Sequence, residues 1–212
     1  MSQASKKKGE ASRSILRAAE ELFAAKGFAA VSVRDIAQLA DVNKALVFYY
    51  YENKATLLRK VLEQYYSQHA AALIPTDPTQ SLREQVHALL TSYLDFIEDN
   101  SRYIHIVQHE LLANGENIDM IRGGMNLLFS RVRDLLSGLG DNGPLHVKHF
   151  FLSFSGLVVA YFTYAPVLDE IWDGDPLSAS NRRERREHLH WVIEQLLRGL
   201  EDIQAKPSAT LS

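Results

Sequence analysis

The chain has 212 residues, 46% hydrophobic and 23% charged, and this composition argues against wholesale disorder because it supplies enough apolar material for a core. It contains no cysteine, which excludes disulfides, thiolate metal sites and cysteine nucleophiles. Residues 1–60 carry 11 basic and 6 acidic side chains, a net charge of +5, whereas the remainder carries −8. Such asymmetry indicates a protein that meets a polyanion with one end.

Helical periodicity predicts three helices in the first 53 residues. The first runs over about 12–26 and ends at Gly27, a natural helix stop. Ser32 and Asp35 form a capping box that opens a short second helix over 33–40. A break at 41–43 separates it from a third helix over 44–50, in which Val47 and either Tyr50 or Tyr51 are expected to face inward. Two short helices joined by a three-residue turn have the dimensions of a helix-turn-helix, whose second helix enters the major groove of DNA.

Six further helices follow, and no strand is predicted. Their expected ranges are about 54–73, 81–98, 101–113, 117–139, 145–165 and 181–203. The predicted fold class is therefore all-α with about nine helices. The expected domains are a helix-turn-helix head at 1–53, an effector-binding and dimerisation domain at 54–204, and a flexible tail at 205–212. Residues 1–11 are expected to form a flexible basic arm, in which Lys6, Lys7 and Lys8 either contact DNA or stay solvated.

Residues 149–168 hold no Asp, Glu, Lys or Arg and have the length of a bilayer span. Ser153, Gly156 and Thr163 interrupt this stretch, and Pro166 ends it. A helix that is apolar nearly all round is equally typical of a twice-buried core helix. The interpretation without a membrane is preferred.

The N-terminal pattern resembles the TetR/AcrR family of transcriptional regulators. The resemblance covers about 50 residues and is carried by Ile15-Leu16-x-Ala18-Ala19-x-x-Leu22-Phe23-x-x-x-Gly27-Phe28, Ser32-Val33-Arg34-Asp35-Ile36-Ala37, Ala40-x-Val42-x-Lys44 and Phe48-x-Tyr50-Tyr51-x-x-Lys54-x-x-Leu57. It implies a ligand-responsive repressor of the cytoplasm that binds a palindromic double-stranded operator. The residues that it implies for DNA binding are Ser32, Arg34, Lys44, Ala45, Leu46, Phe48, Tyr49 and Lys54.

Within that set, Ser32 and Arg34 are expected at phosphate and Lys54 at phosphate beside a helix N-terminus. Two departures from the family pattern bear on function. Asp41 stands where the turn usually has Gly, which costs little if Asp41 adopts the left-handed conformation that Asp tolerates. Phe48 replaces a usual Tyr and its phosphate-binding hydroxyl, a loss for which Tyr49 is a substitute. The Phe48 departure, together with a reading helix that offers only Lys44 as a long charged donor, leaves open a helical effector-binding or scaffold protein whose head is vestigial.

A small-molecule site is expected among the helices from 54 to 165, where aromatic and apolar side chains accompany a few polar groups. The candidate lining residues are Tyr65, Tyr93, Phe96, His105, His109, Leu112, Met125, Phe129, Phe151 and Ser155. They favour an apolar or aromatic effector. His105 and His109 stand four residues apart, but no third ligand or His-Glu-x-x-His motif accompanies them, so neither a metal, a cofactor nor an enzyme is predicted.

The two C-terminal helices, at about 145–165 and 181–203, are expected to form a four-helix bundle with their two-fold mates in a homodimer. The alternative is that both helices only complete the core of a single chain. A homodimer would hold two reading helices at the spacing of successive major grooves.

Overall fold

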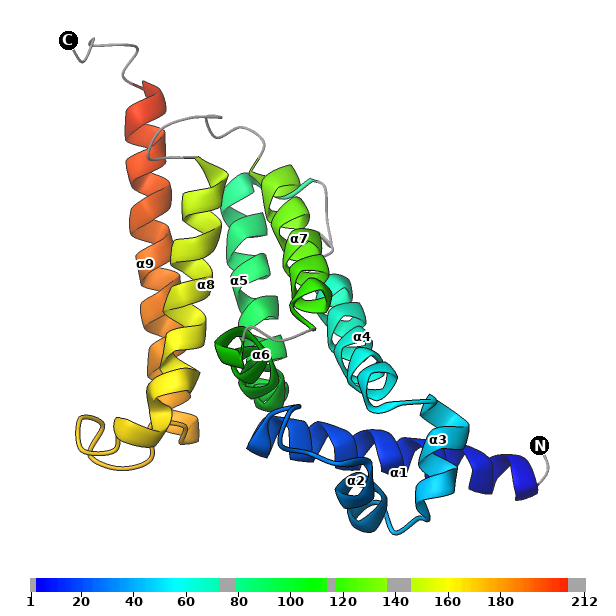
Figure 1. Cartoon of the computed structure of the whole chain (residues 1–212). Coiled ribbons are helices and arrows are strands. Elements are labelled where there is room, and N and C mark those ends of the chain that lie inside the picture. Colours follow the sequence, from blue (N-terminus) through cyan, green and yellow to red (C-terminus); the bar gives the residue numbers. More distant parts are fainter. Residues whose placement is uncertain (1–2, 73–78, 114–116, 137–145, 206–212) are drawn as a thin grey trace. The chain divides into compact units, whose positions relative to one another are not determined.

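The computed structural model describes residues 3–72, 79–113, 117–136 and 146–205. All regular structure in these ranges is helical, so the predicted all-α class is confirmed (Figure 1). The helices are α1 (Gln3–Lys26), α2 (Val33–Leu39), α3 (Lys44–Tyr51), α4 (Lys54–Ala72), α5 (Leu82–Asp99), α6 (Ser101–Ala113), α7 (Ile118–Leu135), α8 (Val147–Tyr164), the 3-10 turn η1 (Ala165–Val167) and α9 (Ala179–Ala205).

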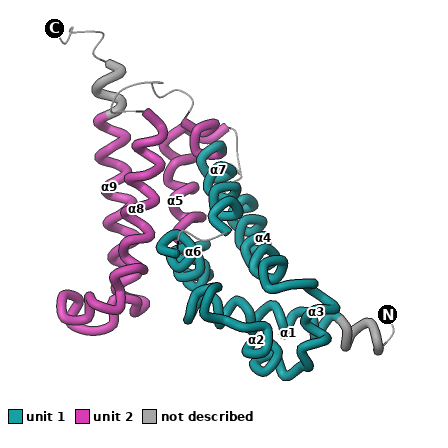
Figure 2. Tube along the Cα trace, in the orientation of Figure 1, with its two compact units in different colours: residues 1–71, 96–130 teal, residues 72–95, 131–212 magenta. Residues whose placement is uncertain are grey.

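The chain forms two compact units (Figure 2). Unit 1 comprises residues 1–71 and 96–130, and unit 2 comprises residues 72–95 and 131–212. The predicted helix-turn-helix head therefore belongs to the same unit as most of α4, all of α6 and most of α7. The expected domain boundary at residue 53 stays a prediction about function, because packing continues past it in unit 1.

The core of unit 1 is built on α1, which packs against α2, α3 and α6. Ile15, Ala19 and Phe23 are fully buried at the helical spacing that the sequence shows. Ile36 of α2 and Leu57 of α4 are also fully buried. Helices as short as α2 and α3 have little stability alone, so this shared core keeps them folded.

Unit 2 is built from part of α5 with α8 and α9. The buried side chains of α9 include Leu189, Ile193 and Leu197, one in every fourth position. Arg185 of α9 donates to the carbonyl of Leu157 in α8, with 2.7 Å between Nη2 and O. The buried side chains of α9 thus lie on one narrow face, whereas its opposite face is exposed.

The first helix begins earlier than the sequence pattern predicted. The expected start was about Ser12, with a flexible arm before it, whereas α1 begins at Gln3. Its backbone therefore carries Lys6, Lys7 and Lys8 in helical conformation. Elongating an existing helix costs little when the added residues are good helix formers such as Ala, Lys and Glu, which explains the difference.

Candidate DNA-binding interface

The N-terminus of α2 is closed by the predicted capping box. The Ser32 hydroxyl accepts from the Asp35 backbone N–H at 3.2 Å, and the Asp35 carboxylate accepts from the Ser32 backbone N–H at 2.9 Å. The hydroxyl also donates to that carboxylate at 2.7 Å. The hydrogen bonds from Ser32 lower the pKa of Asp35. This geometry fixes where the exposed Arg34 leaves the helix.

The turn between α2 and α3 depends on Asp41, which has a φ of 54°. Asp tolerates this left-handed region better than most residues. Asp41 therefore adopts the conformation expected at the position where the TetR/AcrR pattern usually has Gly. After the turn, the Val42 amide donates to the Ala37 carbonyl at 3.0 Å. Asn43 then caps α3 by accepting from the Leu46 amide at 2.8 Å. The direction of α3 is thus set by backbone and cap hydrogen bonds.

The two faces of α3 differ sharply. Val47 and Tyr51 are buried, and the Tyr51 hydroxyl donates to the Ser12 carbonyl of α1 at 2.9 Å. Tyr49 on the other face is 66% exposed. The exposed or half-exposed face holds all five predicted α3 residues, namely Lys44, Ala45, Leu46, Phe48 and Tyr49. The structure therefore brings these residues together on one surface.

Lys54, the first residue of α4, is placed differently from the other predicted DNA-binding residues. Its Nζ donates to the carbonyls of Phe28 at 2.7 Å and Val31 at 2.8 Å. The same ammonium lies 4.1 Å from the centroid of the Phe28 ring. Two of its three donors are therefore taken by the turn between α1 and α2. Its predicted phosphate contact stays a prediction.

Comparison with known proteins identifies the family to which this chain belongs. A sequence profile described as "Bacterial regulatory proteins, tetR family" matches residues 15–61, the segment from the buried face of α1 into α4. The HTH-type transcriptional repressor NicS of Pseudomonas putida is 31% identical over 198 residues, which span 88% of this chain and 90% of NicS. The chain belongs to the TetR family. This TetR-family protein is accordingly a DNA-binding transcriptional regulator and not an enzyme.

More distant relatives agree. The probable HTH-type transcriptional regulator YttP of Bacillus subtilis is 25% identical over 167 residues, 74% of this chain and 79% of YttP. A TetR-like transcriptional regulator from Rhodococcus superposes with a TM-score of 0.66 at 20% identity, covering 89% of this chain and 96% of that structure. At that identity the likeness shows the fold alone.

In unit 1 the predicted effector-binding residues fall into three groups: buried, exposed and half-buried. Phe96 is buried, stacked on His69 of α4 with 4.1 Å between ring centroids, and Tyr65 is buried with its hydroxyl donating to Glu20 at 2.6 Å. Leu112 is 88% exposed and His105 is exposed. The reason is that α6 turns Tyr103, Ile104, Ile106 and Glu110 inward. His109, Met125 and Phe129 are half-buried.

The sequence analysis missed the centre of this aromatic cluster. Tyr66 and His69 of α4 join Phe96 and Tyr103, with 6.0 Å between the rings of Tyr66 and Tyr103 and 5.7 Å between those of Phe96 and Tyr103. Burial lowers the pKa of His69 to about 4 and raises that of Tyr66 to about 12. Both groups are therefore uncharged at neutral pH. Their positions on the inner face of α4 were the only available signal.

In unit 2, Tyr93 of α5 lies beside α8. Its ring is 6.4 Å from that of Phe154, and burial, opposed by a hydrogen bond from Ser155, raises its pKa to about 12. The predicted residues Tyr93 and Ser155 are thus brought together. Phe151 is half-buried on the same helix. Within the described parts of the chain, no group of three His, Asp or Glu side chains is arranged to hold a metal ion.

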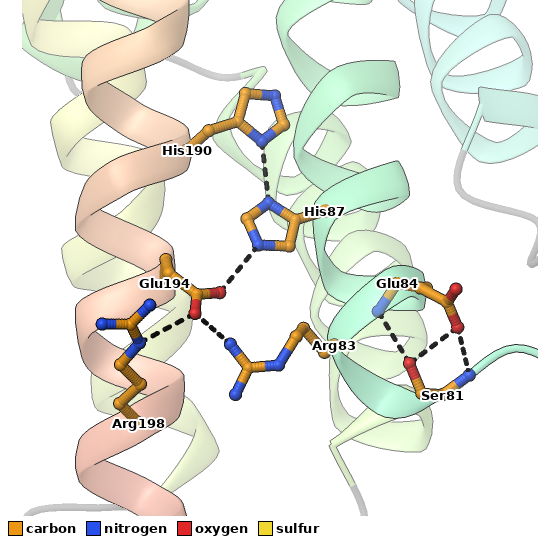
Figure 3. Close-up of polar contacts among 7 residues, drawn as sticks. All are labelled: Ser81, Arg83, Glu84, His87, His190, Glu194 and Arg198. Carbon is orange, nitrogen blue, oxygen red and sulfur yellow. Dashed lines mark hydrogen bonds and ion pairs between the residues drawn. The ribbon is translucent and has the colours of Figure 1, made fainter.

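A polar chain also joins α5 to α9 (Figure 3). His87 Nδ1 lies 2.8 Å from His190 Nδ1, and His87 Nε2 lies 3.4 Å from Glu194 Oε2. Glu194 also accepts from Arg83 and, at 2.9 Å, from Arg198. The hydrogen bond from Arg83 is the main reason that the pKa of Glu194 falls to about 2. Because His87 and His190 are 103 residues apart, no local pattern predicted this contact.

Helix α8 leaves much of its apolar surface uncovered. The segment Val147–Val167 has the length and composition of a bilayer span, but only 22% of its most apolar 18-residue stretch is buried. Leu152 is 70% exposed and Tyr164 is 58% exposed. On α9, Trp191 is 60% exposed and Leu196 is 46% exposed. Much of the apolar surface of α8 and α9 is therefore exposed in the described part of a single chain.

Proposed function

We propose that this protein is a homodimeric repressor that binds a palindromic operator through α3 and releases it when an apolar or aromatic effector binds. The observation that carries the DNA-binding part is the two-faced α3. Its inner face is anchored on α1 through Val47 and Tyr51, and its outer face presents Lys44 and Tyr49 to solvent. A rigidly held helix with an exposed polar and aromatic face fits the major groove.

The proposed contacts follow from chemistry. Lys44 and Arg34 supply positive charge for phosphate, and Tyr49 supplies a hydroxyl in place of the one absent at Phe48. Ala45 and Leu46 offer apolar surface, which suits a thymine methyl group. The Ser32 hydroxyl hydrogen is already donated to Asp35, so we assign Ser32 the role of fixing α2 rather than of donating to phosphate.

The proposed dimer uses the uncovered faces of α8 and α9. Leu152, Leu157 and Trp191 are all exposed apolar side chains of these helices. Gly156 lies in the same stripe of α8, and the space where its Cβ would stand is empty. Small residues allow a partner helix to approach closely, since interhelical distance follows side-chain size. A two-fold bundle of these helices would cover the apolar surface that a single chain leaves open.

The proposed effector site lies against α4, where Tyr66, His69, Phe96 and Tyr103 form a wall of aromatic rings. These groups are neutral, so they fit an apolar or aromatic ligand better than a strongly charged one. An effector that prefers one position of α4 would shift the head between binding and non-binding states. We place the protein in the cytoplasm, where bacterial DNA is found.

Fluorescence anisotropy tests the DNA-binding proposal. The full chain is titrated into labelled duplex from immediately upstream of its own gene and into a scrambled duplex, at several salt concentrations. We expect preference for the upstream duplex, affinity that falls steeply with salt, and loss of preference in Lys44→Ala. Absence of binding to either duplex at low salt would instead support the vestigial head.

A further inference from the structure

Lys54 makes contacts within the protein that a lysine with the sole role of binding phosphate would not need. Its Nζ donates to two backbone carbonyls, of Phe28 at 2.7 Å and Val31 at 2.8 Å, and lies over the Phe28 ring. These carbonyls belong to the turn that joins α1 to α2, whereas Lys54 begins α4. The ammonium therefore ties the first residue of α4 to the turn that leads into the head.

A buried carboxylate on α6 accompanies this tie. Glu110 is 3% exposed and accepts a hydrogen bond from Asn117, itself 3% exposed, with 2.9 Å between Nδ2 and Oε2. Burial lowers the pKa of Lys54, and the negative charge of Glu110 opposes that effect. Glu110 therefore lies near enough to Lys54 for its negative charge to act on the ammonium.

The residue before Glu110 meets the same turn. Gly27 has a φ of 75°, and a Cβ added to it would lie 3.2 Å from the Cγ and Nδ1 atoms of His109. The end of α6 thus packs directly on the backbone that follows α1. The α1–α2 turn thus contacts the start of α4 through Lys54 and the end of α6 through His109, and this junction of three segments lies within unit 1.

We propose that Lys54 is a positioning residue, with Glu110 as a nearby negative charge, that holds the start of α4 on the turn leading into the DNA-reading head. The proposal deepens, and rests on, the proposed DNA-binding function. It assigns Lys54 no phosphate: the lysine holds the α1–α2 turn, and the turn sets where α2 and α3 begin. A displacement of α4 or α6 would then reach the head through this junction.

Salt dependence separates a positioning lysine from a phosphate ligand. Each phosphate contact contributes about 0.9 to the slope of log affinity against log salt, so removing one phosphate-binding lysine lowers the slope by about that amount. Removing a positioning lysine weakens binding at every salt concentration and leaves the slope unchanged. The two roles thus predict different curves for the same substitution.

The experiment compares Lys54→Met, Lys44→Met and Lys60→Met in the full chain by anisotropy on the upstream duplex. Lys60 is the matched control, because it lies on the same helix and is 53% exposed in an ion pair with Glu63. For Lys54→Met we expect affinity at least about tenfold weaker with the wild-type slope, and for Lys44→Met a slope lower by about 0.9. A slope lowered by about 0.9 in Lys54→Met would overturn the proposal.

Hydrogen–deuterium exchange of the free protein supplies a readout that needs no DNA. Glu110→Gln retains an acceptor for Asn117 but removes the charge, so we expect faster exchange in the peptide spanning 28–36 and weaker DNA binding with the wild-type slope. Exchange in that peptide unchanged in both Glu110→Gln and Lys54→Met would refute the junction. If wild-type protein bound no DNA, the proposed function would fail while the exchange result still judged the junction.

Discussion

Replacing Leu152 by alanine tests the proposed dimer through one exposed side chain of α8. Fully burying a leucine contributes about 1.5–3 kcal/mol, and Leu152 is 70% exposed in the single chain. Covering that exposed part would therefore contribute about 1–2 kcal/mol in each subunit. Two-fold symmetry places two such side chains in the interface, so the dimer would lose about 2–4 kcal/mol. This loss corresponds to a dissociation constant raised between roughly 30-fold and 1,000-fold.

Sedimentation equilibrium over a wide range of protein concentrations measures that dissociation constant. The matched control is Leu112→Ala, because Leu112 is 88% exposed but lies on α6, outside the proposed interface. We expect Leu112→Ala to leave self-association unchanged and Leu152→Ala to shift it toward the monomer. Equal effects of the two substitutions, or none from Leu152→Ala, would show that the apolar face of α8 does not hold two chains together.

Two further predictions concern stability. Gly123→Ala and Gly124→Ala are expected to differ in sign: a Cβ at Gly123 meets nothing, so helix propensity should stabilise the protein by about 1 kcal/mol. A Cβ at Gly124 would overlap the ring of Tyr66, and overpacking of this kind costs about 1–3 kcal/mol. Thermal unfolding of both variants measures the contrast, and equal shifts of the melting temperature would contradict it. Acid should also lower the free energy of unfolding. Burial, and then the charge of His87, lower the pKa of His190 in the folded protein. The contribution of His190 to stability is therefore present above its unfolded pKa of about 6.5 and is lost as the pH falls below that value. Urea unfolding at pH 7.5 and pH 5 should show a smaller loss of stability in His190→Gln than in the wild type. An equal loss in the two proteins would show that the contact of His190 with His87 does not cause the pH dependence.

The sequence alone determined the parts of the head that depend on short-range interactions. The capping box of Ser32 and Asp35, the left-handed turn at Asp41 and the range 101–113 of α6 all agree with the structure. Each depends on residues within a few positions of one another, because caps and turns satisfy backbone groups locally. Spacing likewise predicted that Val47 of α3 would face inward.

Only the tertiary structure decided the roles that depend on distant partners. Spacing left Tyr50 and Tyr51 as alternative candidates for burial. In the structure Tyr51 is the buried one, and its hydroxyl donates to the Ser12 carbonyl of α1. Nothing in the sequence indicated that the Lys54 ammonium donates to carbonyls more than 20 residues earlier in the chain. A side chain's hydrogen-bonding groups bind whatever the fold brings within about 3 Å, and periodicity gives only the face on which that side chain stands.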